Sequence, residues 1–101
     1  MVSTIIPIFT KTAAALHIKS IEFRCNADPT TEVTGDIKYA DDLIGLANPT
    51  LIAAIDTAAG TFSSGAINVA VASGKAIYLS YDTNPDAATK FHACEIAFTY
   101  D

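Results

Sequence analysis

The stretch AINVAVASGKAIYLSYD, residues 66–82, decides the fold, because its larger apolar side chains recur with a period of two. They occupy the odd positions from 67 to 71 and from 77 to 81, and most even positions are small or polar. This alternation is typical of a strand that buries one face in an antiparallel sheet. Two such runs, joined by a short link that contains Ser73-Gly74, predict a β-hairpin.

Two other segments repeat the period. In residues 90–101 every even position from 94 to 100 is apolar. Residues 16–25 also alternate, but their apolar positions change from even to odd after Ile18. A one-residue shift would turn every later side chain to the wrong face, so we predict a β-bulge near Lys19-Ser20.

Three further segments complete the pattern. Residues 32–40 alternate and predict a strand. Residues 3–9 form a short apolar run that contains Pro7, which places the run at a sheet edge. Residues 48–60 begin with Asn-Pro and end with glycine, which is the punctuation of a helix. The surrounding strands favour extended structure there, with at most one short helix around residues 49–59.

Several short strands with turn signals between them, in a chain of 101 residues, predict one all-β domain over residues 1–101. We expect an antiparallel two-sheet β-sandwich, jelly-roll-like, because each sheet has one apolar face that needs another layer over it. Residues 1–10 are either an edge strand of this sandwich or an arm that contacts a neighbouring protein.

The composition indicates a protein that covers part of its surface with a partner. Half of its residues are hydrophobic and only 17% are charged, against about 25% in an average domain. Alanine, which contributes little area, supplies much of this apolar count, but a small domain with such a surplus favours a covered patch. The net charge is −5 and the basic residues are scattered, which argues against nucleic acid as a partner. Residues 1–27 carry a net +2 and the remainder a net −7.

No membrane span or export signal is predicted. No run reaches the roughly 18 apolar residues that a membrane helix needs. The first 20 residues lack a basic start and are interrupted by Pro7 and Lys11, so they do not form a signal peptide. We therefore expect synthesis in a host cytoplasm, where Cys25 and Cys94 stay free thiols.

The acidic stretch DTNPD, residues 82–86, matches the first half of a calcium-binding loop. Such a loop needs a glycine at its sixth position and a glutamate at its twelfth, and these positions hold Ala87 and Ala93. We interpret the stretch as a turn that ends a strand, because Asp and Asn side chains bond their own backbone in such turns. Asp41-Asp42 is interpreted in the same way, as a solvated loop.

His17, His92 and Cys94 raise the question of zinc binding or nucleophilic catalysis. Neither the C-x₂₋₄-C nor the H-x₃₋₅-H spacing of a zinc site occurs, and no G-x-S-x-G surrounds a serine. We interpret the three residues as packed core residues. The sequence thus predicts a protein that is not an enzyme, with no catalytic residue, no metal site and no cofactor.

The candidate functional residues are therefore contact residues. Tyr78 has the opposite parity to its apolar neighbours and is expected to face outward, where a tyrosine can stack on a sugar or anchor an interface. The N-terminal run supplies apolar area for the same purpose. The predicted interface residues are Ile5, Ile6, Ile8, Phe9, Lys11 and Tyr78.

Three stretches carry a family resemblance: TGDIKYADDLIGLANPTLIAAIDTAAG (residues 34–60), VASGKAIYLSYDTNPDA (71–87) and the terminal FTYD (98–101). Over residues 15–101 the chain resembles small phage virion accessory proteins, the β-sandwich capsid decoration (cement) proteins and related tail-associated sandwiches. The resemblance implies a structural virion protein that binds the major capsid protein or another virion protein. It also implies self-association, often as a trimer, contacts by the N-terminal segment, and no catalysis.

Capsid decoration, with the protein located in the virion, is therefore the favoured hypothesis. The alternative is a glycan- or receptor-binding β-sandwich on a virion or cell surface. Outward-facing tyrosines and acidic loops would suit that alternative.

Overall fold

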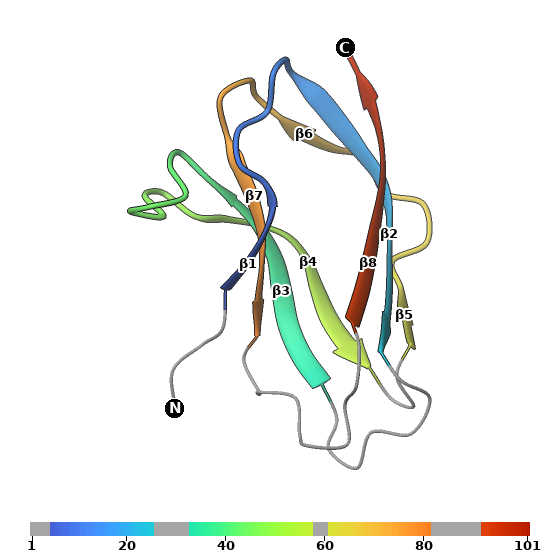
Figure 1. Cartoon of the computed structure of the whole chain (residues 1–101). Helices are drawn as coiled ribbons and strands as arrows, with labels where there is room; N and C mark the ends of the chain where they lie inside the picture. The colour runs from blue at the N-terminus through green and yellow to red at the C-terminus, as the bar shows by residue number, and fades with distance from the viewer. Residues whose placement is uncertain (1–4, 26–32, 58–60, 82–91) are drawn as a thin grey trace.

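The computed structural model describes residues 5–25, 33–57, 61–81 and 92–101, and these form eight β-strands. The first sheet has the order β1 (Ile5–Phe9), β7 (Ala76–Tyr81), β3 (Val33–Ala40) and β4 (Thr50–Thr57). In the second sheet, β8 (His92–Tyr100) pairs with one side of β2 (Leu16–Cys25), and β5 (Thr61–Ser63) and β6 (Val69–Val71) pair with the other. The two antiparallel sheets face each other (Figure 1), so the predicted β-sandwich is confirmed.

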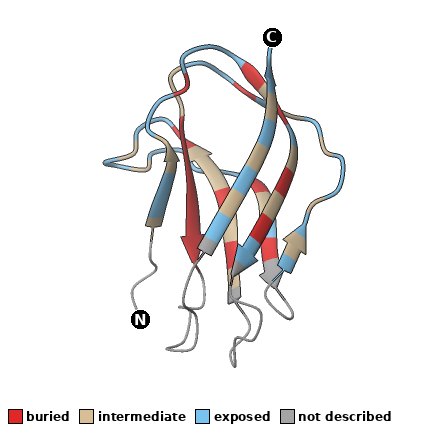
Figure 2. Ribbon diagram, turned by 45° about the vertical axis from the view of Figure 1, so that its right-hand side comes forward, coloured by how far each residue is buried: buried red, intermediate tan, exposed pale blue. Residues whose placement is uncertain are grey.

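The core lies between the two sheets, and β7 is its most buried strand. β7 is paired on both sides, with β1 and with β3, and all six of its residues are buried (Figure 2). Side chains of β2, β3, β4 and β6 complete the core. The largest fully buried side chains are Leu16, Ile18, Ile21, Phe23, Ile37, Val71, Ile77 and Tyr81.

The predicted β-bulge in β2 is confirmed. Pairing with β8 slips between Ile18 and Ser20, at the position where the apolar parity changes. Because of this extra residue, Ile18 and Ile21 both point into the core, and both are fully buried.

The predicted hairpin is wrong, because β6 and β7 belong to different sheets. β6 pairs with β2 in the second sheet, whereas β7 pairs with β1 and β3 in the first. The link Ala72–Lys75 therefore carries the chain from one sheet to the other, with Gly74 at a left-handed φ of 79°. Alternation specifies which side chains are buried, and both runs keep their apolar residues on the core side. It does not specify the neighbouring strand.

Thr12 fastens this link to the segment between β1 and β2. Its Oγ1 donates a hydrogen bond to the Ala72 carbonyl at 2.8 Å and accepts one from the Lys75 amide at 3.0 Å. Its own amide and carbonyl bond to Lys75 and Gly74, both at 2.8 Å. Thr12 is 3% exposed, so a buried polar residue far from the link in sequence stabilises the crossing.

Residues 49–59 contain a strand rather than a helix. β4 pairs along most of β3, from Thr57 opposite Val33 to Thr50 opposite Tyr39. Asn48, at a φ of 52°, has a left-handed backbone, whereas a residue that caps a helix has an extended one. The extended structure favoured for this segment is confirmed.

β1 lies at the edge of the first sheet, where Pro7 was expected. Pro7 sits opposite Tyr78, and the pairing shifts between Pro7 and Phe9. Proline lacks an amide donor, and an edge strand tolerates this loss. Residues 5–9 thus pair within their own sandwich. The described residues include no helix with the length and apolar character that crossing a membrane requires.

Candidate functional site: the open side of the sandwich

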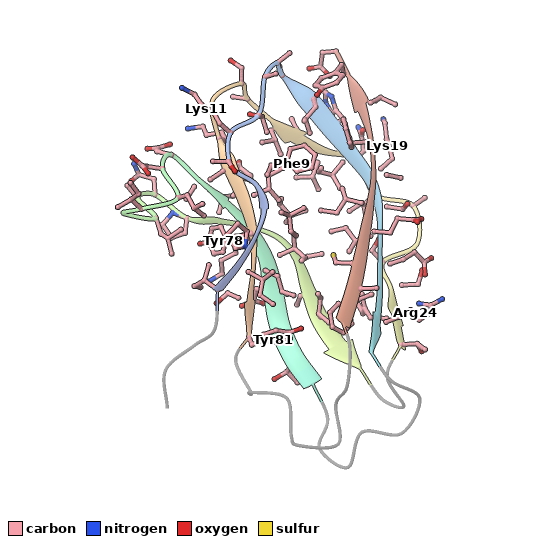
Figure 3. The ribbon with its side chains drawn as sticks, in the orientation of Figure 1. Phe9, Lys11, Lys19, Arg24, Tyr78 and Tyr81 are labelled. Atoms are coloured by element: carbon pink, nitrogen blue, oxygen red, sulfur yellow. The ribbon has the colours of Figure 1, made fainter. Side chains whose placement is uncertain are left out.

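The edges of the two sheets leave one side of the sandwich open. β1 ends the first sheet and β8 ends the second on this side. They meet through Phe9 and Phe98, whose rings are edge to face with centroids 5.3 Å apart, and Phe98 meets Tyr100 in the same way at 5.3 Å. Figure 3 shows Phe9 between the two strands. We call this region the open side.

A groove of about 820 Å³ runs along the open side. Its floor consists of Ile8, Phe9, Cys94 and Ile96, which are half-buried and pack against the core. β1 has five residues and β8 has nine, so β1 covers only part of its neighbour. Among the residues that the structure describes, these four side chains therefore leave a contiguous apolar surface in contact with water.

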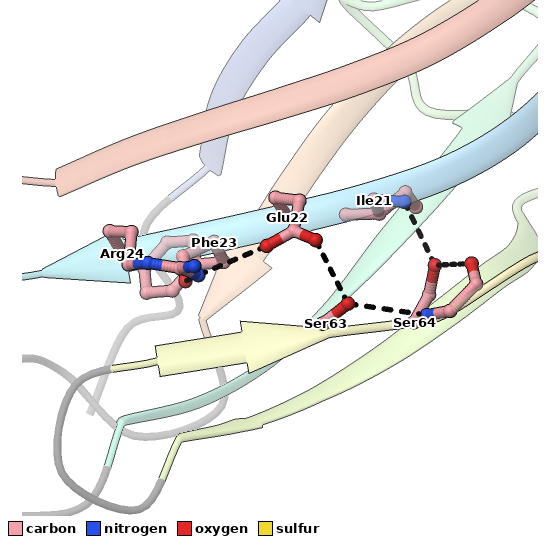
Figure 4. Close-up of polar contacts among 7 residues, drawn as sticks. Ile21, Glu22, Phe23, Arg24, Ser63 and Ser64 are labelled. Atoms are coloured by element: carbon pink, nitrogen blue, oxygen red, sulfur yellow. Dashed lines mark hydrogen bonds and ion pairs between the residues drawn. The ribbon is translucent and has the colours of Figure 1, made fainter.

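The rim of the groove is polar. It includes Glu22, Arg24 and Glu95, and β2 places Glu22 directly opposite Glu95 on β8. Like charges at opposite positions of a sheet repel. Arg24 offsets this repulsion, because its guanidinium lies 3.1 Å from the Glu22 carboxylate, which also accepts a hydrogen bond from Ser63 Oγ at 2.9 Å (Figure 4).

Cys94 is the thiol in the groove, and it is free. Burial raises the pKa of this thiol above its ordinary value, so the group stays protonated near neutral pH and is a poor nucleophile. The side chain of Cys25 lies outside the described residues, and so does that of His92. The predicted free state of Cys25 therefore stays a prediction.

The sequence predicted that His17 is a core residue, and this prediction is wrong. His17 has the opposite parity to Leu16 and Ile18 on β2, and its Nδ1 lies 2.5 Å from Asp101 Oδ1 on the surface. Within the described ranges, no three or more His, Cys, Asp or Glu side chains gather where they could hold a metal ion. The stretch of residues 82–86 lies outside those ranges.

Five of the six predicted interface residues fall into two groups. Ile8 and Phe9 line the groove, whereas Ile5, Ile6 and Lys11 lie elsewhere along β1 and the segment after it. Ile6 is 37% exposed at the sheet edge.

Tyr78 was expected on the surface, and this expectation is wrong. Its side chain is 3% exposed, because Pro7 of β1 and Lys38 of β3 flank it on paired strands. Burial, and secondarily the negative charge of Asp36, raises the pKa of the Tyr78 hydroxyl. Alternation places Tyr78 opposite its apolar neighbours, but it does not reveal the two strands that flank the ring.

Residues 41–48, in the loop between β3 and β4, are a second feature that the sequence did not predict as a contact. They project from the first sheet (Figure 1), and we call them the finger. The Asp41 amide donates to the Ala47 carbonyl at 2.9 Å and closes the base. The Leu46 amide donates to the Asp42 carbonyl at 2.7 Å and forms an inner turn. The finger is therefore internally bonded.

The Asp41 carboxylate ties the finger to the body of the protein. It accepts hydrogen bonds from Lys75 Nζ and, at 2.6 Å, from Asn48 Nδ2. The hydrogen bond from Lys75, and to a smaller extent the one from Asn48, holds the pKa of Asp41 below its ordinary value. Asp41 and Asp42 are both exposed, as predicted for a solvated loop.

The finger presents an isoleucine at its tip. Ile44 is 96% exposed, and its amide donates to Asp42 Oδ1 at 2.7 Å. Two residues without glycine's freedom, Leu46 at a φ of 49° and Asn48 at 52°, hold left-handed backbones nearby, which costs free energy. The apolar letters L-I-G-L between Asp42 and Ala47 are the only sequence signal for this tip.

No family model, curated protein or solved structure gives a significant match to this chain. The fold and the site define its class as a small antiparallel β-sandwich with an uncovered apolar side.

Proposed function

We propose that this chain is a structural virion protein that decorates and stabilises a phage capsid by binding capsid subunits and further copies of itself. The observation that supports this proposal best is the open side, where half-buried apolar residues line a groove of about 820 Å³. When a neighbouring subunit covers an apolar surface of this kind, the free energy of the assembly falls.

The edge strands of the open side add a second means of contact. Within the described residues β8 pairs on one side alone, with β2, and it carries neither proline nor lysine. Unpaired amides and carbonyls along such an edge accept a strand from another chain. A subunit that covers the groove can thus also bond to the backbone of β8.

The glycan-binding alternative rested on outward-facing tyrosines, Tyr78 foremost, and on acidic loops. Because Tyr78 is 3% exposed, its ring has no free face on which a sugar could stack. The alternative thus loses the tyrosine named for it, and capsid decoration stays the proposal.

The test is the composition and stability of the virus particle. Virions purified from the source virus should contain the chain in many copies, measured by peptide mass mapping with labelled standards. Particles from a mutant that lacks the gene should release their genome at a lower temperature, and added purified chain should restore the wild-type temperature. An Ile96→Arg chain, altered in the groove, should restore it poorly. If the chain is absent from purified virions, or if its loss leaves particle stability unchanged, the proposal is wrong.

A further inference from the structure

We infer that copies of this chain associate head to tail, with Ile44 at the tip of one finger seated in the groove of the next copy. This inference rests on the self-association in the proposed function and names both halves of the contact. It assigns the groove to a second copy of the chain.

The finger has the properties of an anchor. A single exposed apolar residue is ordinary on a protein surface, but Ile44 is 96% exposed on a loop held by several hydrogen bonds. The left-handed backbones of Leu46 and Asn48 give the finger a strained, defined shape. A tip that is already ordered loses little further conformational freedom when it binds.

The groove has the properties of a receptor for such a tip. Its apolar floor of Ile8, Phe9, Cys94 and Ile96 is half-buried. Its volume of about 820 Å³ exceeds that of one isoleucine side chain.

Both halves are present on one chain but apart from each other. The finger joins β3 to β4, whereas the groove lies between β1 and β8. The exposure of Ile44 shows that the finger does not fill its own groove. A second copy offers a finger to every groove, and a contact between two different surfaces closes into a ring when the rotation permits.

The experiment measures self-association by sedimentation velocity over a concentration series, with purified full-length chain. Ile44→Ser removes the tip, and its folding is safe because the side chain contacts water. Leu51→Ser is the matched control, since Leu51 is 54% exposed on β4 and lies outside both finger and groove. We expect Ile44→Ser to weaken association about 10- to 100-fold, and Leu51→Ser to leave it unchanged.

A mixing experiment tests the head-to-tail arrangement. Ile96→Ser alters the groove but keeps the finger. If this variant melts at a lower temperature than the wild type, Ile8→Ser is used in its place. Each variant alone should be monomeric at the concentration where the wild type assembles. A one-to-one mixture with Ile44→Ser should form dimers, because one intact finger then meets one intact groove.

Three results would overturn the inference. The wild-type chain could stay monomeric at the highest soluble concentration, or Ile44→Ser could assemble as the wild type does. The mixture could also fail to form dimers, which would show that like surfaces pair with like. None of these results bears on whether the chain is present in virions, so the proposed function is tested separately.

Discussion

Gly35 is the residue at which the first sheet leaves no room for a side chain. A Cβ added there would lie 2.5 Å from the Ser80 carbonyl oxygen and 3.2 Å from Tyr81 Cα. Both are backbone atoms of the paired strand β7, so β3 and β7 would have to move apart. We predict that Gly35→Ala lowers the free energy of unfolding by about 2–3 kcal/mol, measured by urea denaturation.

Gly45, in the finger, provides the matched control. A Cβ added at Gly45 meets no atom within 4 Å, so Gly45→Ala should change the free energy of unfolding by less than about 0.5 kcal/mol. If the two variants unfold at the same urea concentration, the close approach at Gly35 is not real.

Thr12 tests the value of a buried hydroxyl that serves two partners. Thr12→Val keeps the shape of the side chain but leaves the Ala72 carbonyl and the Lys75 amide without their Oγ1 partner. Leaving such groups unsatisfied costs about 1–3 kcal/mol, which thermal and urea unfolding should detect. Thr10→Val, at an exposed position in the same segment, should be close to neutral. Equal effects of the two substitutions would argue against a special role for Thr12.

Asp41 makes the hold on the finger depend on pH. Its pKa is lower in the folded chain than in the unfolded chain, because Lys75 and then Asn48 donate to its charged form. The stabilisation is therefore present above the ordinary pKa of 3.8 and is lost as the pH falls through the lower folded value. In an NMR titration, Lys75→Met should raise the pKa of Asp41. Lys38→Met, which removes the ion pair with Asp36, should leave the Asp41 titration where it was.

At the scale of elements, alternation in the sequence predicts features within one strand but not which strands lie beside it. The alternation of residues 16–25 was enough to locate the bulge after Ile18, because a parity change can be read within one strand. The partner of β6 could not be read in this way, since a pleated run has the same alternation whichever strand lies beside it. The cover over Tyr78 was equally hidden, because it comes from β1, far away in the sequence.

The candidate site was predictable only in part, for the same reason. The sequence placed contact residues in the N-terminal run, and Ile8 and Phe9 do lie in the groove. It did not predict that Ile44 is exposed, because the sequence does not distinguish an exposed apolar residue in a short acidic loop from one that folds back onto the core. The left-handed backbone of Leu46, which helps to shape the finger, has no signature in a single sequence.

The pairing of β1 favours an edge strand of the sandwich over an arm that contacts a neighbouring protein. β1 pairs with β7, flanks Tyr78 through Pro7 and packs Phe9 on Phe98. Removal of residues 1–10 should therefore lower the free energy of unfolding by at least about 2 kcal/mol, since it exposes apolar area on both sheets. Urea denaturation of the truncated chain measures this. Unchanged stability would show that these residues act as an arm in solution.

At the scale of the whole molecule, net charge opposes the association that the open side favours. Each copy carries a net charge of −5, so two copies repel at low ionic strength, while the contact between Ile44 and the groove is apolar and insensitive to salt. Raising the salt concentration from about 0.02 to about 0.5 M shortens the screening length from roughly 20 to roughly 4 Å. We therefore predict that self-association strengthens with salt, measured as the sedimentation coefficient at a fixed chain concentration. An ion-paired contact would respond in the opposite direction. Weaker association at high salt would therefore contradict the apolar contact at Ile44 and point instead to the charged rim around Glu22, Arg24 and Glu95.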